Sequence, residues 1–551
     1  MLWQTPWTRL APAIISLTLF HPRFAHGACH IGTYSYPRAC GKDYDYTGFT
    51  TDQNERAAEV VEQFRFAWNG YYKYAFPHDD LRPANNTFSD SRNGWGLTAI
   101  DALDTAIIMG QTDIVKVILD FVPTVDFTKN NSPGPVTTSL FETNIRYLGG
   151  LLSAYDLLKG PFNATYTNTK QVDALLSQAK VVADTLKFCF DTPTGLPVNN
   201  VYIGNKSFAD SGKLDDYSYY AGLAEIGTLQ LEWQHLSDLT GDPSYGDLVQ
   251  RAESYWFKGK EVWPGLTGGL FNVSSGEIID PYGGWTSGND SAYEYLIKMY
   301  VYDPDRYHNY SIRWQQAADS TIAHALSSPS SRPDLVTAGT WSTADAPITK
   351  YSEHLACFIG GNFILGSTAL KMPKYMDYGL KFAEWCANGY RYAASGIGPL
   401  LFSWDTKLLE DPDLKNQTSL YEKAGWFIGE KGVFQGGQAP EAVESWYYAY
   451  QATGDQYWRD VAWSYVLAQN RTMRTGSGFA SINNIFAKDG GGTRNFMHSF
   501  LLAEVFKYQY LIQAPREKGG IWDVLYGEDK VNYFVYNTEA HPLRVRAKKP
   551  V

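Results

Sequence analysis

From about Asn54 to about Leu511 the chain repeats one pattern, in which apolar residues recur at spacings of three and four. This is the period of an α-helix with a buried face. Gly, Pro, Asn and Asp separate about a dozen such segments, and no linker-like stretch divides them. The pattern therefore predicts a single all-helical domain, whose helices include Ser139–Leu158, Ser291–Tyr302, Glu441–Thr453 and Met497–Leu511.

A faint internal repeat indicates how these helices are arranged. The segment LSDLTGDPSY (236–245) recurs loosely as YQATGDQY (450–457). In both copies one helix ends at Gly and the next begins after Asp. Helical hairpins joined in this way and repeated around a circle make an (α/α) barrel, which leaves a cavity on its axis.

The C-terminal stretch VNYFVYNTEAHPLRV (531–545) is apolar, although a chain end is usually polar and solvated. Its aromatic and β-branched residues predict a strand that breaks at 537–542. We expect a hairpin that enters the body of the protein and plugs the axial cavity. The alternative is an edge strand that ends in a turn. Thr538 and Glu539 offer carbonyl, hydroxyl and carboxylate oxygens, which are the ligands that Ca²⁺ prefers.

Composition limits the possible functions. With 44% hydrophobic and 15% aromatic residues, the chain of 551 residues has ample material for a core and is not disordered. The 17 Trp and 39 Tyr residues suit either sugar binding or the packing of a large helical core. The net charge of −11 argues against a nucleic-acid partner.

The N-terminus predicts export. Arg9 precedes an apolar run from Leu10 to Phe20, and Ala25-His26-Gly27 is typical of a signal cleavage site. The run is too short to span a bilayer, so we expect no membrane span after cleavage. The C-terminus lacks a retention signal of the KDEL type, so the predicted location is the secretory pathway: secreted, or in the ER or Golgi lumen. Nine acceptor motifs for N-glycosylation support a secretory glycoprotein, at Asn85, Asn130, Asn163, Asn205, Asn272, Asn289, Asn309, Asn416 and Asn470.

Five cysteines remain for an oxidising compartment. The candidate pairs are Cys29–Cys40 and Cys357–Cys386, which would leave Cys189 free, although spacing alone does not establish a pairing. No Cys or His spacing suggests zinc.

Several predicted helices carry carboxylates at or near their first turn. Glu142 lies four residues before Arg146 in an apolar setting, Asp290 precedes a helix, and Glu441 and Glu444 open another. Taken singly, these residues could form a solvated ion pair, an N-cap and a dipole-favoured first turn. Taken together, they predict acids that converge on one cavity. Glycoside hydrolysis requires such a set, because one acid protonates the leaving oxygen and another activates water.

A series of ordered blocks resembles glycoside hydrolase family 47, the class I α-1,2-mannosidases of the secretory pathway. The blocks are AWNGYYKYAFPHDDLRP (67–83), AIDALDTAIIMG (99–110), SLFETNIRYLGGLLSAYDL (139–157), LAEIGTLQLEWQHLSDLTGDPSY (223–245), NDSAYEYLIKMY (289–300), EHLACFIGG (353–361), APEAVESWYYAYQATGD (439–455), MHSFLLAEVFKY (497–508) and NTEAHPL (537–543).

The resemblance implies an all-α (αα)7 barrel plugged by a C-terminal β-hairpin, one Ca²⁺ at the barrel floor and an inverting mechanism. The expected organisation is a signal peptide at 1–27, an N-terminal extension at 28–53, the catalytic domain at 54–545 and a basic tail at 546–551.

By the same resemblance, Glu142 corresponds to the general acid, and Asp290 and Glu441 to the two carboxylates that handle the nucleophilic water. Which of those two is the base stays open. Thr538 corresponds to the direct Ca²⁺ ligand, and Cys357–Cys386 to the family's disulfide. Further residues correspond to the substrate pocket or to holders of metal-bound water: Arg146, Glu225, His354, Glu444, Phe500, Glu504 and Glu539.

Three positions depart from the family's motifs. Ala439 replaces the Arg of Arg-Pro-Glu, Leu400 replaces the Glu of Gly-x-x-Pro-Glu, and His498 replaces the Glu of Met-Glu-Ser-Phe. The loss of an Arg beside a catalytic carboxylate changes that carboxylate's pKa and widens the cleft. The core acids survive all three changes, so we expect hydrolysis, with a linkage and an oligosaccharide preference that the motifs do not fix.

The predicted function is that of a monomeric, inverting, Ca²⁺-dependent exo-α-mannosidase that hydrolyses terminal α-1,2-linked mannose of high-mannose N-glycans or mannan oligosaccharides. One alternative is a weakly active or inactive mannose-binding protein of glycoprotein quality control with the same fold. Another is a structural helical toroid without a carbohydrate ligand, which fits poorly with the retention of every core acid.

Overall fold

In a computed structural model of the chain, the described residues are 28–31, 34–37, 48–132, 136–166, 168–215, 218–526 and 532–546. The predicted signal peptide at 1–27 lies outside this range, as do all but the first residue of the predicted basic tail.

Helices make up most of the described chain. The α-helices are α1 (Gln53–Tyr74), α2 (Leu97–Ile108), α3 (Thr112–Phe121), α4 (Leu140–Glu142), α5 (Gly149–Lys159), α6 (Thr169–Leu186), α7 (Leu223–Gly227), α8 (Gln230–Thr240), α9 (Ser244–Lys258), α10 (Asp290–Tyr302), α11 (His308–Ser320), α12 (Phe358–Leu370), α13 (Pro373–Tyr392), α14 (Thr418–Ala424), α15 (Glu441–Thr453), α16 (Gln456–Thr472), α17 (Phe506–Gln513) and α18 (Ile521–Tyr526).

Shorter helical turns extend or connect these helices. The π-helical turns are η2 (Thr143–Leu148), η5 (Thr321–Ala325) and η9 (Leu501–Val505). The 3-10 turns are η1 (Val122–Thr124), η3 (Lys187–Phe190), η4 (Asp210–Gly212), η6 (His354–Cys357), η7 (Thr406–Glu410) and η8 (Lys415–Gln417).

The strands are short and form small antiparallel sheets, of which the largest has the order β13-β12-β9-β8. They are β1 (Ala28–Ile31), β2 (Tyr34–Pro37), β3 (Asp80–Arg82), β4 (Thr87–Ser89), β5 (Thr138–Ser139), β6 (Asn200–Tyr202), β7 (Ser207–Phe208), β8 (Lys213–Asp215), β9 (Ser218–Gly222), β10 (Glu261–Trp263), β11 (Leu266–Thr267), β12 (Leu270–Asn272), β13 (Ile278–Asp280), β14 (Leu326–Ser327), β15 (Thr337–Ala338), β16 (Tyr351–Glu353), β17 (Leu401–Ser403), β18 (Phe534–Tyr536) and β19 (Pro542–Arg544).

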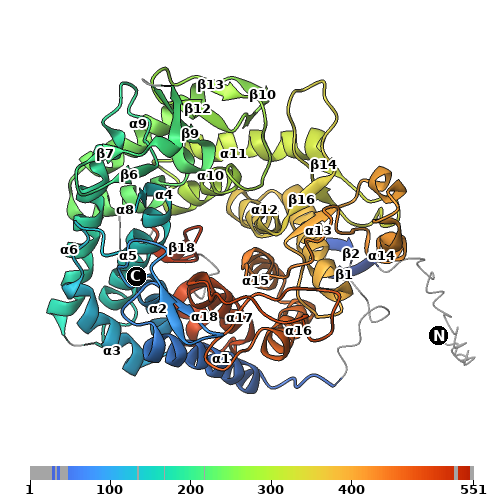
Figure 1. The fold of residues 1–551 in the computed structure, drawn as a ribbon, viewed down its shortest axis with the longest axis horizontal. Coiled ribbons are helices and arrows are strands. Elements are labelled where there is room, and N and C mark those ends of the chain that lie inside the picture. Colours follow the sequence, from blue (N-terminus) through green and yellow to red (C-terminus); the bar gives the residue numbers. More distant parts are fainter. Residues whose placement is uncertain are drawn as a thin grey trace, which may run out of the picture.

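The helices form two concentric rings (Figure 1). The inner ring runs α2, α5, α8, α10, α12, α15, α17, in which each helix contacts the next and α17 returns to α2. Each inner helix also packs against one outer helix, in the pairs α2–α3, α5–α6, α8–α9, α10–α11, α12–α13, α15–α16 and α17–α1. This is the (αα)7 barrel that the sequence predicts.

Burial explains which helices lie inside. Every residue of α2 is buried, so this helix has no face for solvent. The outer helix α6 instead buries one stripe at spacings of three and four, formed by Val172, Leu175, Ala179, Val182, Ala183 and Leu186. A helix that is buried on every side fits only between two layers of protein.

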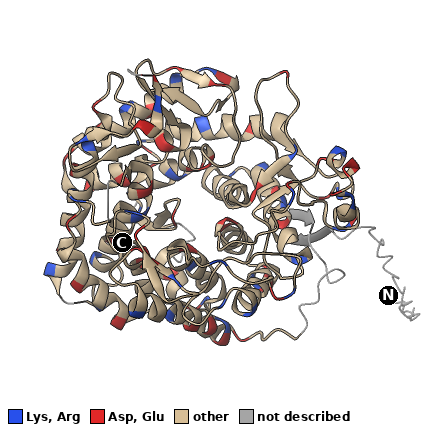
Figure 2. Cartoon of the chain, viewed as in Figure 1, with Lys and Arg blue, Asp and Glu red and all other residues tan. Residues whose placement is uncertain are grey.

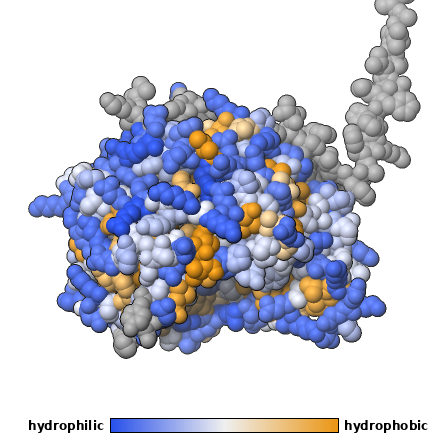
Figure 3. Space-filling model, turned by 90° about the horizontal axis from the view of Figure 1, so that it is seen from above, coloured by the Kyte–Doolittle hydropathy of each residue, from blue (hydrophilic) through white to orange (hydrophobic). Residues whose placement is uncertain are grey.

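Charged residues lie mainly on the outer helices and loops, and acidic positions also occur on helices around the centre of the ring (Figure 2). The face shown in Figure 3 is largely hydrophilic, with small separate apolar patches. Among the described residues, no helix combines the length and the apolar character needed to cross a membrane.

A C-terminal hairpin fills part of the barrel, as predicted. β18 and β19 pair antiparallel, with Phe534 opposite Arg544 and Tyr536 opposite Pro542. β18 contacts α10, and β19 contacts α5 and α8, so the hairpin packs against the inner ring. Figure 1 shows it inside the ring. The three residues of β18 are buried, as expected of a plug and not of an edge strand.

The predicted disulfide is present. Cys357 and Cys386 are bonded, with their Cα atoms 5.9 Å apart, and the bond joins η6 in front of the inner helix α12 to the outer helix α13. Cys189 is free and buried. The other candidate pair, Cys29–Cys40, lies outside the side chains that the structure describes.

Candidate active site

A cavity of about 390 Å³ opens where the N-terminal ends of inner helices meet the turn of the C-terminal hairpin. All but one of the predicted site residues line it. These are Glu142, Arg146, Glu225, Asp290, Glu441, Glu444, Phe500, Glu504, Thr538 and Glu539. The sequence separates these residues by up to about four hundred positions, and the closed ring of helices brings them together.

Glu142 is held between two arginines. Ser139 caps its short helix by accepting a hydrogen bond from the Glu142 N–H, and the π-helical turn η2 follows. One carboxylate oxygen lies 2.7 Å from Arg92 and the other 2.7 Å from Nε of Arg146. Burial alone would raise the pKa of Glu142, but the charges of Arg146 and Arg92 outweigh it and lower the pKa to about 2. Glu142 is therefore ionised in the free protein.

Asp290 is the first residue of α10. It is not the N-cap of this helix, because the cap position is occupied by Asn289. The carboxylate accepts a hydrogen bond from the N–H of Ser291 at 2.9 Å. Burial, with the neighbouring charges of Glu353 and Glu294, raises the pKa of Asp290 to about 7. Asp290 thus holds a proton at a pH where Glu142 does not.

Glu441 opens α15 and contacts a histidine. His354 Nδ1 lies 2.8 Å from the Glu441 carboxylate, and His354 Nε2 lies 2.8 Å from the Tyr390 hydroxyl. His354 is the one predicted site residue that does not line the cavity. It is buried behind Glu441 and fixes the direction of that carboxylate, so its place is that of a positioning residue.

Three further acids lie deeper in the cavity. Burial raises the pKa of Glu444 and of Glu539 to about 8, and raises that of Glu504 strongly. Two cations reach this group: Lys298 lies 3.6 Å from Glu444, and Arg146 pairs with Glu539. These raised pKa values mean that the three acids hold protons near pH 7, and a bound cation would favour their ionised forms.

Thr538 lines the cavity beside these acids, at the turn of the hairpin. Within the described parts of the chain, no three His, Cys, Asp or Glu side chains are grouped so that they alone could hold a metal ion. A metal at this position would need the carbonyl and hydroxyl of Thr538, with water held by the surrounding carboxylates. Hard oxygen donors in an acidic setting fit Ca²⁺.

The turn that carries Thr538 is rigidly held. Asn537 Oδ1 accepts hydrogen bonds from the N–H groups of Glu539 and His541, at 2.9 and 2.8 Å. His541 Nδ1 in turn lies 2.7 Å from Asp104 on the inner helix α2. A Cβ at Gly149 would lie 2.5 Å from the Asn537 amide, so only glycine lets the turn approach α5 this closely.

An aromatic row leads out of the cavity. The ring of Phe500 lies under Arg146 at 5.8 Å and stacks on His498, with ring centres 4.5 Å apart. Phe496 meets the other side of His498 edge-on at 4.5 Å. Burial and the charges of nearby arginines lower the pKa of His498 to about 4, so this ring is neutral near pH 7.

The three departures from the family motifs meet in one place. The Gln438 side chain donates to the carbonyl of Phe496 and accepts from the N–H of His498, which joins the segment of Ala439 to that of His498. Leu400 lies against Gly437, two residues before Ala439. Positions scattered through the sequence thus lie near one another, and Ala439 among them lines the cavity.

A second hollow, of about 480 Å³, shares Glu225, Ser287 and Gly288 with the first. Tyr282 and Trp341 also line it, and Tyr282 is 66% exposed. The two hollows together form a longer cleft than one sugar ring needs.

Sequence reasoning missed several side chains that act on the site. Glu294 lines the cavity four residues after Asp290, and this helical spacing could have revealed it. Arg92, Glu353 and Tyr390 carry no comparable signal. Arg92 lies in a loop, Glu353 ends β16 and Tyr390 lies on the outer helix α13, and only the fold places them beside the catalytic candidates.

Comparison with known proteins identifies the family of the chain. The family model described as glycosyl hydrolase family 47 matches residues 63–545. The chain is 47% identical over 494 residues to the mannosyl-oligosaccharide alpha-1,2-mannosidase 1B of Aspergillus phoenicis, a match that covers 89% of this chain and 91% of that protein. It is 46% identical to the mannosyl-oligosaccharide alpha-1,2-mannosidase of Penicillium citrinum, over 89% of this chain and 92% of that one.

Among solved structures, the alpha-1,2-mannosidase from Trichoderma reesei superposes with a TM-score of 0.84 at 44% identity, covering 90% of this chain and all of that one. Its fold and the family match extend over the helical ring and the hairpin alike. This chain belongs to glycosyl hydrolase family 47.

Proposed function

We propose that the protein is an inverting α-1,2-mannosidase that removes terminal mannose from high-mannose N-glycans. Family membership makes it a glycoside hydrolase. One observation carries the proposal: Glu142, Asp290 and Glu441 come from three different helices, α4, α10 and α15, and line one cavity, whose floor suits a divalent cation. Acids on different elements can act on opposite sides of a sugar ring.

Glu441 is our candidate for the base. Its carboxylate is oriented by His354, which Tyr390 fixes in turn. In the reaction Glu441 takes a proton from water as the water oxygen attacks the anomeric carbon. The bond from that carbon to the leaving oxygen breaks, and the leaving oxygen receives a proton from the acid.

Two residues compete for the role of the acid. The motif resemblance assigns it to Glu142, but Arg92 and Arg146 hold the pKa of Glu142 at about 2. Asp290 has a pKa of about 7 and therefore carries the proton that the leaving group needs. We favour Asp290 as the proton donor, with Glu142 as a fixed negative charge that stabilises the cationic sugar in the transition state.

Thr538 is the proposed Ca²⁺ ligand, through its carbonyl and hydroxyl. Glu225, Glu444, Glu504 and Glu539 would hold metal-bound water or sugar hydroxyls, and Phe500 and Arg146 would contact the ring. When bound, Ca²⁺ would supply positive charge and coordinate sugar hydroxyls at the cavity floor.

The shared cleft suggests where the rest of an oligosaccharide lies. We place the leaving part of the glycan along the second hollow, against the exposed ring of Tyr282. We also propose that residues 1–27 are removed during export, that 28–53 precede the catalytic domain at 54–545, and that the mature protein is a monomer.

The first test is release of free mannose from α-1,2-mannobiose and a high-mannose glycan panel, with and without EDTA. We expect release that EDTA abolishes. Ca²⁺-dependent binding of the same glycans without release would overturn the enzyme and favour a mannose-binding protein of the same fold.

A substrate whose leaving group needs no protonation can identify the general acid. Asp290→Asn, Glu142→Gln and Glu441→Gln are each assayed on the glycan and on α-mannosyl fluoride, because fluoride leaves without protonation. We expect fluoride to rescue Asp290→Asn and not Glu441→Gln. Rescue of Glu142→Gln with no rescue of Asp290→Asn would return the acid role to Glu142.

A further inference from the structure

We propose that Asn416 carries an N-glycan whose first sugars fold back into a cavity of the protein itself, where they pack on Phe434 and Phe486. This site lies outside the barrel cavity and shares no lining residue with it. The occupant is a covalent part of this chain, and the site is structural.

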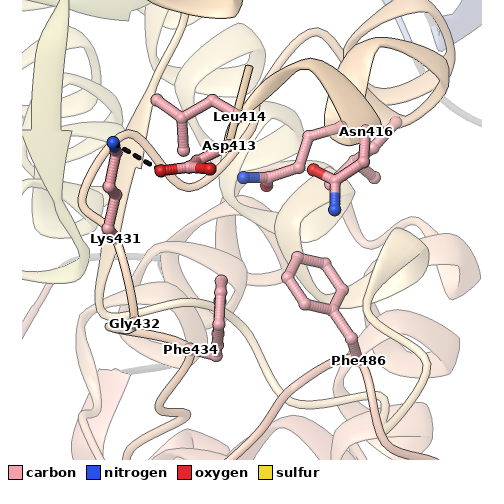
Figure 4. Close-up of a pocket in the computed structure, with 9 residues that line it drawn as sticks. Asp413, Leu414, Asn416, Lys431, Gly432, Phe434 and Phe486 are labelled. Atoms are coloured by element: carbon pink, nitrogen blue, oxygen red, sulfur yellow. Dashed lines mark hydrogen bonds and ion pairs between the residues drawn. The ribbon is translucent and has the colours of Figure 1, made fainter. Parts of the chain in front are cut away.

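The cavity has the size and character of a sugar site. It measures about 580 Å³, within the range of pockets that hold small ligands. Figure 4 shows Asn416 on one side and the rings of Phe434 and Phe486 on the other. Leu414 and Leu420 also contribute to the wall. The apolar C–H face of a pyranose ring can cover such a surface, whereas water cannot.

The two rings are held in place as a pair. Their centres are 5.7 Å apart with an angle of 61° between the planes, so they form a corner. The N–H of Ile485 donates to the carbonyl of Phe434 at 2.8 Å, which fixes the two segments to each other. Phe486 is nevertheless 36% exposed. A large apolar ring that is fixed and still exposed indicates a surface that something else covers.

A glycan attached to Asn416 would lie close enough to cover these rings. Asn416 begins the motif Asn416-Gln417-Thr418, and its side chain is exposed at the rim of the cavity. The backbone beneath it is fixed, because Gln417 exchanges two hydrogen bonds with the backbone of Ile428, at 2.9 and 3.0 Å. The backbone next to Asn416 is therefore tied to the segment of Ile428, which precedes Phe434 by six residues.

A polar edge completes the cavity. Lys431 pairs with Asp413 at 2.8 Å along one side (Figure 4). The hydroxyl and acetamido groups of N-acetylglucosamine can hydrogen-bond to such an edge while the ring face covers the phenylalanines. Apolar walls with a few polar groups are typical of carbohydrate sites.

Other acceptor motifs of the chain lack this setting. The amide nitrogen of Asn130 donates to Asn93 and to Val136, and the amide nitrogen of Asn470 donates to Glu59. Both side chains therefore already form hydrogen bonds within the folded protein. Asn163 is exposed like Asn416 but lines neither this cavity nor the barrel cavity, so it is a matched control.

The modification follows ordinary chemistry. The donor is an oligosaccharide linked through diphosphate to a lipid. The amide nitrogen of Asn416 bonds to C1 of the first N-acetylglucosamine, the bond from C1 to the diphosphate oxygen breaks, and the diphosphate leaves with the electron pair. The nitrogen loses one proton. The phenylalanines follow later in the chain and meet the sugar when it folds.

The test uses the full chain secreted from a eukaryotic host. Peptide mass spectrometry gives the occupancy of Asn416 and Asn163, and glycosidase digestion of the native protein gives the release rate at each. We expect Asn416 to be occupied and its glycan to be released about tenfold more slowly than that of Asn163, because access requires local opening. In Phe434→Ala/Phe486→Ala the two rates should become equal.

Thermal unfolding supplies a second readout. Asn416→Gln removes the acceptor and should lower Tm by roughly 1–3 °C, whereas Asn163→Gln should not. In the background of Phe434→Ala/Phe486→Ala, this loss should vanish. An unoccupied Asn416, equal release rates in the wild type, or a loss of Tm that persists without the phenylalanines would each overturn the proposal.

Discussion

Asp290 is the catalytic candidate whose charge changes near neutral pH. Its pKa of about 7 means that it is protonated below that pH and ionised above it. If Asp290 donates the proton, kcat/KM falls as pH rises through about 7. Asp290→Asn should abolish this fall of kcat/KM with rising pH, the alkaline limb of the pH profile, and should lower kcat/KM by about 10²–10⁴-fold. A pH profile of glycan hydrolysis measures both effects, and a limb that survives in Asp290→Asn would contradict the assignment.

His498 sets the position of Phe500 by stacking on it. His498→Ala removes this contact, and we expect kcat/KM to fall by about threefold to tenfold, the range that a stacked pair supports. His498→Phe keeps a ring and should stay within about twofold of the wild type. Steady-state kinetics on mannobiose distinguish the two variants. Equal loss in both would mean that the imidazole acts through its nitrogens.

At the scale of the residue, motifs identified the acids but not their states of protonation. The family blocks pointed to Glu142, Asp290 and Glu441 without any structure. The pKa of Glu142, by contrast, depends on Arg92, which lies 50 positions earlier in a loop of no recognisable pattern. Charge at a site is set by neighbours in space, and the sequence does not order residues by distance.

The C-terminal hairpin is the element on which the site depends most, and His541 anchors it. The charge of Asp104 overcomes burial and raises the pKa of His541 from 6.5 to about 9. The stabilisation, on the order of 3 kcal/mol, is fully present below pH 6.5 and is lost as pH rises through about 9. His541→Gln should therefore lower Tm strongly at pH 6. The difference in Tm between the wild type and the variant should become smaller at pH 9.5. A difference that does not change with pH would show that the charge of His541 does not stabilise the hairpin.

Close approach of the hairpin to α5 gives a second prediction. In Gly149→Ala the new Cβ would lie 2.5 Å from the Asn537 amide, and the turn with Thr538 must shift. We expect Ca²⁺ to bind more weakly and the rate of mannose release to fall at least about tenfold, because small displacements of groups at an active site slow the reaction. Gly389→Ala is the control, since its Cβ would meet Pro399 at an ordinary 3.4 Å. Equal effects of both substitutions would show a general cost of the methyl group.

Helical periodicity predicted some elements well and others poorly. The predicted helix Glu441–Thr453 has the same bounds as α15. The predicted helix Ser139–Leu158 is instead α4, a π-helical turn and α5. The stretch Met497–Leu511 likewise contains η9 before α17. A π-turn changes the register without changing the apolar pattern, and both of these turns lie at the active site.

The whole molecule should respond to the metal. A cation that binds beside Thr538 only in the folded protein would stabilise the fold. Ca²⁺ at about 100 times its Kd would stabilise the fold by about 2.7 kcal/mol, which corresponds to a rise in Tm of roughly 2–3 °C for a chain of this length. EDTA should reverse this rise in Tm, and the rise should be smaller in Thr538→Val. If the Tm of the wild type does not change on addition of Ca²⁺, the protein does not bind Ca²⁺ at this site.

The architecture of the whole was predictable because it repeats. A dozen helical segments and one recurring turn indicate a ring, and the family blocks fix its number of helix pairs. The small sheets were not predicted. Strands such as β9 and β12 are too short to show an alternating pattern, and they form because distant segments meet at the ends of helices.

The closure of the ring also bears on protein synthesis. Thr538 and Glu539 leave the ribosome after every helix of the barrel, and α17 must reach back to α2 before the hairpin can enter. A nascent chain therefore carries its candidate catalytic acids long before it can assemble a working cavity. A product cut short before the hairpin would have no activity. The enzyme thus cannot trim glycans, on itself or on its neighbours, until the barrel is complete.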